Sequence, residues 1–161
     1  MFLPQRPRSV VHAIGPEEAE ALAEIHAEGF ERGWSAEELA ALVGDPAVIT
    51  FVLRRHSMFW PPRLGGFVLV RTVADEAEVL SIVVRPLFQG RGCGRMLMEE
   101  VLRRLYRDRV ANCFLEVDRD NRAAVHLYES LGFKTVGERK GYYHRLDAPA
   151  GVALVMRPSL R

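Results

Sequence analysis

One segment of the chain combines glycines and arginines in a way that suits phosphate binding. It reads Val83-Val84-Arg85-Pro86-Leu87-Phe88-Gln89-Gly90-Arg91-Gly92-Cys93-Gly94-Arg95. Its glycines alternate with other residues, after a β-branched run and before an amphipathic helical pattern. Successive backbone N–H groups can therefore point at one spot, at the positive end of a helix. Because such donors bind phosphate, the segment predicts a site for a diphosphate-bearing cofactor, with arginines adding charge.

Two widespread phosphate loops do not match this segment. The dinucleotide fingerprint requires a glycine three residues after Gly92, where this chain has Arg95. The nucleoside-triphosphate loop ends in Gly-Lys-Ser or Gly-Lys-Thr, whereas this chain has Gly94-Arg95-Met96. From the loop alone, the alternative to a cofactor site is a plain glycine turn at the start of a helix.

The composition is that of an ordinary globular enzyme-sized domain. The chain has 161 residues, of which 27% are charged and 48% hydrophobic, so we expect one domain over residues 1–161. A formal net charge of +1 argues against a dedicated nucleic-acid binder. The sequence shows neither a signal-peptide core nor an apolar run of about 20 residues, so we expect a cytoplasmic protein without membrane contact.

Cysteine and histidine usage gives no sign of a metal site. The two cysteines, Cys93 and Cys113, form neither a disulfide framework nor a metal-ligand spacing, and the five histidines are scattered. We therefore expect no metal cofactor. Composition leaves the oligomeric state open between a monomer and a homodimer.

Hydrophobic periodicity predicts elements in the order β-α-α-β-β-β-α-β-α-β-β. The expected strands are 10–14, 48–54, 65–73, 78–85, 113–117, 134–139 and 152–157. The expected helices are 17–30, 36–43, 93–107 and a helix that starts at Asp120 or Asn121 and runs to Leu131. Ser35 with Glu38 is typical of a helix start, and Gly132 of a helix end. The turn at 58–62 is unusually aromatic for an exposed hairpin.

Two segments resemble a known family. Gln89-x-x-Gly92-x-Gly94 resembles the loop by which the GNAT superfamily of N-acetyltransferases holds the pyrophosphate of acetyl-coenzyme A. Phe114-Leu115-Glu116-Val117 and the stretch from Asn121 to Phe133 resemble the LEV…N…A…LYESLGF pattern of bacterial ribosomal-protein alanine N-acetyltransferases. The pair Trp34-Ser35 is similar to a pair in that family. The resemblance implies an α/β fold of the mixed α+β type, with a central mixed sheet splayed at the coenzyme A site.

The resemblance also implies which groups bind acetyl-CoA. In such a fold the unpaired main chain of Ile82, Val83 and Val84 would bind the pantetheine arm and the thioester oxygen. The residues that would surround the pyrophosphate are Gln89, Gly90, Arg91, Gly92, Cys93, Gly94 and Arg95. Asn121 would contact the coenzyme arm, cap the next helix, or do both. Cys93 stands at the expected helix start, where a thiolate would be favoured, but we interpret it as a small residue tolerated in the loop and not as a covalent acetyl carrier.

Two side chains are candidates for the proton transfers. Glu116 is an acidic residue in an otherwise apolar strand, and the resemblance matches it to a catalytic base. The alternatives are that Glu116 forms a surface ion pair, or that Glu78 on the preceding strand is the base. Tyr128 matches the tyrosine whose hydroxyl approaches the coenzyme sulfur, which makes it the candidate general acid. The alternative is a packed core tyrosine, since aromatic residues at helical spacing are usually that.

The acceptor is harder to identify. Four aromatic residues are candidates to line a peptide groove, and they suit plain packing equally well: Phe30, Trp34, Tyr142 and Tyr143. An α-amine has a pKa near 8, against about 10.4 for lysine, so it is easier to deprotonate. The resemblance therefore implies transfer of acetyl from acetyl-CoA to a primary amine, foremost a protein N-terminus such as that of a ribosomal protein. A small-molecule amine acetyltransferase and a non-catalytic acyl-CoA-binding module are the alternatives.

Overall fold

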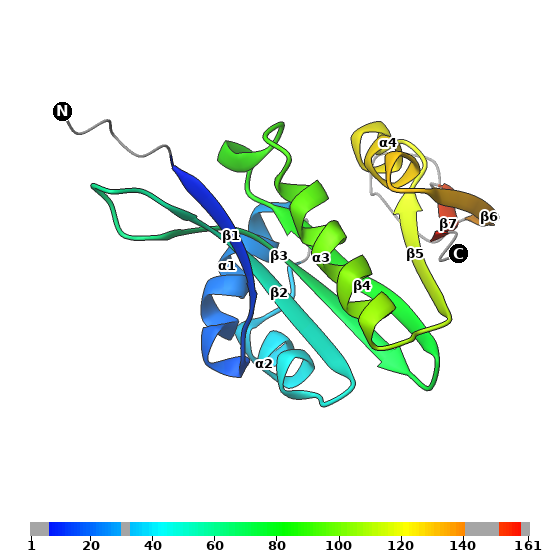
Figure 1. The fold of residues 1–161 in the computed structure, drawn as a ribbon, viewed down its shortest axis with the longest axis horizontal. Helices are drawn as coiled ribbons and strands as arrows, with labels where there is room; N and C mark the ends of the chain where they lie inside the picture. Colours follow the sequence, from blue (N-terminus) through cyan, green and yellow to red (C-terminus); the bar gives the residue numbers. More distant parts are fainter. Residues whose placement is uncertain (1–6, 30–32, 141–151, 159–161) are drawn as a thin grey trace.

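The structure, a computed structural model, describes residues 7–29, 33–140 and 152–158. These residues form one mixed sheet with α-helices packed on it (Figure 1). The strands are β1 Arg8–Ala13, β2 Val48–His56, β3 Arg63–Val73, β4 Glu76–Val84, β5 Asn112–Asp118, β6 Phe133–Lys140 and β7 Val152–Pro158. The α-helices are α1 Ala19–Gly29, α2 Ala36–Gly44, α3 Cys93–Arg107 and α4 Arg122–Ser130, and short 3-10 turns cover Pro16–Glu18 and Pro86–Phe88.

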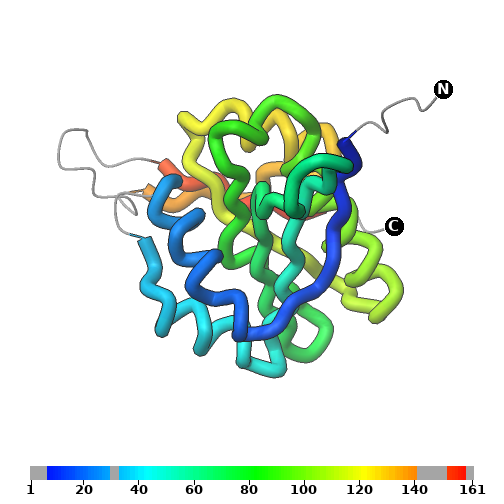
Figure 2. Tube along the Cα trace, turned by 90° about the vertical axis from the view of Figure 1, so that its left-hand side faces the viewer, coloured from blue at the N-terminus to red at the C-terminus, as the bar shows by residue number. Residues whose placement is uncertain are grey.

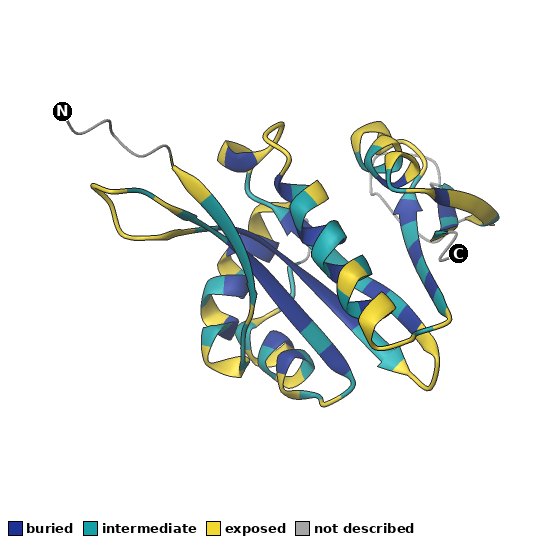
Figure 3. Ribbon diagram, viewed as in Figure 1, coloured by how far each residue is buried: buried dark blue, intermediate teal, exposed yellow. Residues whose placement is uncertain are grey.

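Helices cover both faces of the sheet, whose strand order is β1-β2-β3-β4-β5-β7-β6. Helices α1 and α2 lie on one side and α3 on the other (Figure 2). Two buried clusters correspond to these layers: one joins the sheet to α3 and α4, and the second joins the sheet to α1 and α2. Strands β2 and β3 are accordingly buried along most of their length, whereas most residues of β4 are half-buried (Figure 3). We call the two sides the α3 face and the α1 face.

The sheet opens between β4 and β5. These strands pair in parallel only from Glu76–Asn112 to Val79–Leu115. Beyond that point β5 pairs with β7 as far as Asp118, whereas β4 continues along β3 alone. The half of β4 that leads to the glycine loop therefore has no strand partner on its β5 side, which confirms the predicted splay.

A β-bulge lies on β4 just where the strands separate. In the β3–β4 register Val70 faces Val79 and Leu69 faces Ser81, so Leu80 is an extra residue on β4. An extra residue shifts the alternation of side chains between the two faces of a sheet. Val79 packs in the cluster on the α3 face, while Leu80 packs on the α1 face.

Helix boundaries follow the local signals closely. Ser35 and Glu38 form the expected reciprocal capping box at the start of α2, with Ser35 Oγ accepting from the Glu38 N–H at 3.1 Å. Asn121 caps α4, and Gly132 follows its end with a φ of 92°. One difference is the first helix, expected from residue 17, because Pro16–Glu18 forms a 3-10 turn instead. Its N-cap, Gly15, has no side chain to satisfy the first N–H groups, so the turn tightens.

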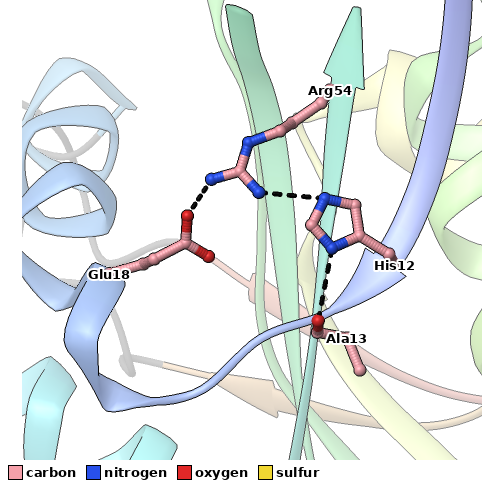
Figure 4. A network of polar contacts seen from close by, with 4 residues as sticks. All are labelled: His12, Ala13, Glu18 and Arg54. Carbon is pink, nitrogen blue, oxygen red and sulfur yellow. Dashed lines mark hydrogen bonds and ion pairs between the residues drawn. The ribbon is translucent and has the colours of Figure 1, made fainter. Parts of the chain in front are cut away.

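The β2–β3 hairpin projects beyond the body of the sheet (Figures 1 and 3). Its tip carries the aromatic residues noted in the sequence, and Phe59 and Trp60 are 75% and 71% exposed. At the base of the hairpin Arg54 donates to Glu18 and, at 2.9 Å, to His12 Nε2 (Figure 4). Since arginine only donates, His12 is protonated on Nδ1, which faces the Ala13 carbonyl at 3.3 Å. This network ties β1 to β2 and to the turn before α1.

Candidate active site

A cleft of about 1380 Å³ lies where β4 and β5 separate. Its walls include Tyr128, which packs in the cluster on the α3 face, and Leu80 and Gly29 from the α1 side. Because residues from both faces line it, the cleft passes through the sheet. It brings together these predicted site residues: Ile82, Val84, Gln89, Gly90, Gly92, Cys93, Gly94, Arg95, Glu116, Asn121 and Tyr128.

The glycine loop presents unpaired main-chain donors to this cleft. Gly90 and Gly92 have φ angles of 73° and 78°, a conformation that favours glycine. Gly92 is the N-cap of α3 and supplies no side-chain cap, so the N–H groups of the first turn of α3 are left for a ligand. A Cβ at Gly94 would lie 3.1 Å from Leu127 on α4 and would narrow the passage between the two helices. These features fit a diphosphate.

Side chains around the loop fix its position. Phe88 is buried beneath it, and a Cβ at Gly65 would lie 2.8 Å from the Phe88 ring, so Gly65 makes room for this contact. Gln89 donates from Nε2 to the Val84 carbonyl at 3.0 Å. Arg95 donates to Ser130 Oγ at 2.5 Å and so joins α3 to α4 at the cleft. Gln89 thus holds the loop against the end of β4.

The main chain of β4 alternates between its neighbour β3 and the open cleft. The Val83 carbonyl oxygen faces β3, since a Cβ on Gly66 would lie only 2.5 Å from it. Successive residues of a strand point their main-chain groups to opposite sides, so those of Ile82 and Val84 face the side that β5 has left. The Val83 side chain packs in the cluster on the α1 face. Of the three predicted strand residues, Val83 therefore lies outside the cleft.

Glu116 lies in the cleft on the α1 face of the sheet. Its neighbours Leu115 and Val117 pack on the α3 face, so strand alternation directs Glu116 to the opposite side. Its side chain is 18% exposed, and the carboxylate pairs with Arg139 at 3.1 Å. Both sequence interpretations of Glu116 thus describe part of its surroundings. Glu78 instead lies in the stretch where β4 and β5 are still paired, opposite Phe114, and does not line the cleft.

Tyr128 lies on the other side of the same opening. Its side chain is 5% exposed and packs against Phe133, with ring centroids 5.7 Å apart. Burial raises the pKa of Tyr128 to about 12, so the hydroxyl keeps its proton at neutral pH and remains a donor. Asn121, about two helical turns before Tyr128, accepts from the Ala124 N–H at 3.2 Å and also lines the cleft.

The raised pKa of Tyr128 predicts a loss of stability at high pH. The folded-state pKa lies above the unfolded value of 10, so this contribution is intact below pH 10 and is lost as pH rises toward 12. This difference in pKa between the folded and unfolded states corresponds to about 2 to 3 kcal/mol. We expect Tyr128→Phe to remove this part of the alkaline decline in the free energy of unfolding, measured by urea titration between pH 8 and pH 11.

Tyr106→Phe is the matched control, because Tyr106 is 77% exposed. This variant should keep the wild-type decline. Burial also raises the pKa of Cys113 to about 12, which adds a decline from pH 9 that all three proteins share. Identical curves for the wild type and Tyr128→Phe above pH 10 would contradict the assignment.

Other predicted site residues are placed differently. Burial raises the pKa of Cys93, an effect larger than the opposing charges of Arg55 and Arg91, which favours the interpretation of Cys93 as a small residue tolerated in the loop. Arg91 is exposed and does not line the cleft. Trp34 stacks on His26 with ring centroids 4.6 Å apart and packs in the cluster on the α1 face. The remaining acceptor candidates lie outside the described residues: Phe30, Tyr142 and Tyr143.

Among the lining residues that were not predicted from the sequence are two serines. Ser130 accepts a hydrogen bond from Arg95, and Ser81 is a single polar residue in an apolar run. Ser81 shows the pattern that singled out Glu116, which is one polar residue in an otherwise apolar strand. Among the described ranges, no three potential ligand side chains gather as a metal site would require. Nor does any described helix have the length and apolar character needed to cross a membrane.

Known sequences identify relatives of this chain. The Acetyltransferase (GNAT) family matches residues 19–133. The [Ribosomal protein bS18]-alanine N-acetyltransferase of Escherichia coli K12 is 33% identical over 125 residues, which cover 78% of this chain and 80% of that protein. The Salmonella typhimurium protein of the same name is 44% identical over 81 residues, and this match spans 50% of the chain and 55% of the relative.

A solved structure shares the fold. The crystal structure of the ribosomal-protein-S18-alanine N-acetyltransferase from Escherichia coli matches with a TM-score of 0.83 at 28% identity, over 94% of this chain and 93% of that one. The chain therefore belongs to the GNAT family of acetyl-CoA-dependent N-acetyltransferases, which confirms the fold, the enzyme class and the cofactor predicted from the sequence.

Proposed function

We propose that the protein transfers acetyl from acetyl-CoA to the α-amine of a protein N-terminus, with a ribosomal protein as the candidate substrate. The observation that carries this proposal is the cleft through the sheet, which has Glu116 on one side of the opening and Tyr128 on the other. Such a passage admits the donor from the α3 face and the acceptor from the α1 face. Acetyl-CoA supplies an acetyl group activated as a thioester.

The chain's own groups suit the binding of the donor. The N–H groups at the start of α3, together with Arg95, would hold the diphosphate. The main-chain groups of Ile82 and Val84 would hydrogen-bond the pantetheine arm, taking the place of the missing strand partner. Main-chain dipoles fixed at the bulge would stabilise charge on the carbonyl oxygen, which is a large contribution in acyl transfer.

The two side chains would move the protons. Glu116 would accept a proton from the incoming ammonium, directly or through a water molecule, on the α1 face. Tyr128 would donate its proton toward the sulfur on the α3 face, which its neutral, protonated state permits. The named relatives act on an alanine of ribosomal protein bS18, and an α-amine with a pKa near 8 needs only a modest base.

An acceptor screen tests this function. Purified protein and acetyl-CoA are incubated with peptides that carry free N-termini, among them N-terminal alanine, and in parallel with small amines. Release of free thiol and the mass of the product report transfer. Turnover of peptides over small amines supports the proposal, whereas turnover of small amines alone would reassign the substrate. Coenzyme binding without any turnover would favour a binding module.

Glu116→Gln should produce a pH-dependent loss of activity. Glutamine keeps the shape and hydrogen bonding of the side chain but accepts no proton. The rate should fall most below about pH 8, where the α-amine is protonated, and recover in part above it, where the amine deprotonates unaided. The measurement is the pH–rate profile of the variant against that of the wild type.

Glu78→Gln is the matched control, because Glu78 lies on the neighbouring strand outside the cleft. Its profile should follow the wild type. A uniform loss at every pH in Glu116→Gln would assign a structural role to its ion pair with Arg139. Rescue at high pH in Glu78→Gln alone would move the base to β4.

A further inference from the structure

Ser81 presents a buried hydroxyl that the described part of the chain leaves unsatisfied. Its Oγ is buried and has no hydrogen-bond partner among the described residues, although Ser81 lines the cleft. A buried hydroxyl without a partner costs about 1 to 3 kcal/mol, so native proteins contain few of them. A ligand that enters the cleft can supply the missing partner, which marks Ser81 as a binding group.

The bulge at Leu80 decides which way Ser81 faces. Ser81 lies opposite Leu69, whose side chain packs on the α1 face, and register partners point to the same side of a sheet. If side chains alternated strictly through Leu80, Ser81 would share a face with Val79 and would point toward α3. Bulges re-aim side chains in this way at functional sites. Ser81 therefore faces the same side as Glu116.

Ser81 and Glu116 thus approach the cleft from its two edges. Ser81 follows the last paired residues of β4, and Glu116 follows the last residue of β5 that pairs with β4, Leu115. Both lie on the α1 face, the side away from Tyr128. A hydroxyl both accepts and donates a hydrogen bond, whereas a carboxylate only accepts. The pair therefore suits a ligand with more than one N–H.

We propose that Ser81 is an acceptor-binding residue, whose Oγ accepts a hydrogen bond from the primary amine that attacks the acetyl group. The amine would then give one N–H to Ser81 and its surplus proton to Glu116, which directs the nitrogen lone pair into the opening between β4 and β5. Ser81 acts on the position of the nucleophile and takes no part in proton transfer. This inference rests on the proposed function, since it assumes that the acceptor enters from the α1 face.

Thr50 provides a matched control for Ser81. Its Oγ1 is the other buried side-chain oxygen without a hydrogen-bond partner among the described residues. In the sheet register Thr50 faces Leu69, which faces Ser81, so the two hydroxyls lie in one row and on one face. Thr50 is two strands away from the cleft and does not line it. A difference between the Ser81 and Thr50 variants therefore reflects the position of Ser81 in the cleft and not the loss of a buried hydroxyl as such.

The test compares Ser81→Ala with Thr50→Val in the full chain. Both variants should unfold at a temperature equal to or above that of the wild type without ligand, since each removes an unsatisfied hydroxyl. Ser81→Ala should raise KM for an N-terminal alanine peptide by roughly tenfold, the effect of one lost hydrogen bond of about 1.4 kcal/mol. The Kd for acetyl-CoA should not change. Thr50→Val should leave both constants as they are, and Ser81→Thr should restore part of the affinity for the peptide.

Two results would overturn the assignment. An unchanged KM in Ser81→Ala would show that the hydroxyl does not hold the acceptor. A weaker Kd for acetyl-CoA with an unchanged KM would assign Ser81 to the coenzyme arm instead. If the wild type acetylates only small amines, the proposed peptide substrate fails but the Ser81 test does not. The same comparison is then made with the amine that is turned over.

Discussion

Replacing Gly92 with aspartate is expected to abolish binding of acetyl-CoA while the protein remains folded. Gly92 has a φ of 78°, and a side chain there meets open space but must adopt a left-handed conformation, which costs about 1 to 2 kcal/mol. The carboxylate would stand at the N-terminus of α3, where it would occupy the donors and repel a diphosphate. Loss of two charge-assisted hydrogen bonds alone weakens binding by ~100-fold or more. Calorimetric titration with acetyl-CoA measures the change.

Gly92→Asn separates charge repulsion from blockage. Asparagine has the shape of aspartate, carries no charge and tolerates the left-handed conformation. It should bind acetyl-CoA more tightly than Gly92→Asp and more weakly than the wild type. Circular dichroism spectra like that of the wild type would show that both variants fold. An aspartate variant with the affinity of the wild type would remove the glycine loop from the coenzyme site.

The second large effect is expected at Tyr128. Tyr128→Phe should lower kcat by ~10²-fold or more, the usual contribution of a general acid. The Kd for acetyl-CoA should change little, because the ring packing against Phe133 is retained. The raised pKa of Tyr128 keeps the hydroxyl protonated, so the activity it supports should not decline between pH 7 and pH 9. Steady-state rates at saturating acetyl-CoA test this.

Thioester donors with different leaving thiols separate proton donation by Tyr128 from its packing. A thioester with a more acidic leaving thiol needs less help from an acid, so the deficit of Tyr128→Phe should shrink with such a donor. An equal deficit with every donor, or a rate near that of the wild type, would show that Tyr128 is a packed core residue and not the general acid.

Signals that act over a few residues were predictable from the sequence. The glycine loop, the capping box of Ser35 with Glu38 and the Asn121 cap depend on local conformation, and the structure contains all three. The splay was foreseen only through the family resemblance, since no local pattern states which strands part. The position of Trp34 against His26 depends on the packing of α1 and α2, which periodicity alone does not specify.

The surroundings of Glu116 and Ser81 show why the rest of the site could not be predicted from the sequence. Arg139 comes from a strand that follows Glu116 by more than twenty residues, and nothing in the sequence pairs the two. Ser81 faces the cleft only because Leu80 is a bulge, and a strict alternation along β4 would direct Ser81 toward α3. Registers and bulges are set by the whole sheet, so a pattern of apolar and polar residues does not reveal them.

Because the ladder between β4 and β5 is short, bound coenzyme would contribute to the stability of the protein. Only the four positions from Glu76 to Val79 join β4 to β5, so the main-chain amides of Ile82 and Val84 lack a strand partner. Such amides exchange with solvent through small local openings and without global unfolding. A pantetheine arm hydrogen-bonded along β4 would slow their exchange and connect the two parts of the sheet. Ligand linkage at a hundred times Kd adds about 2.7 kcal/mol to the free energy of unfolding. The resistance of this fold to heat and proteolysis would then follow the concentration of acetyl-CoA around it.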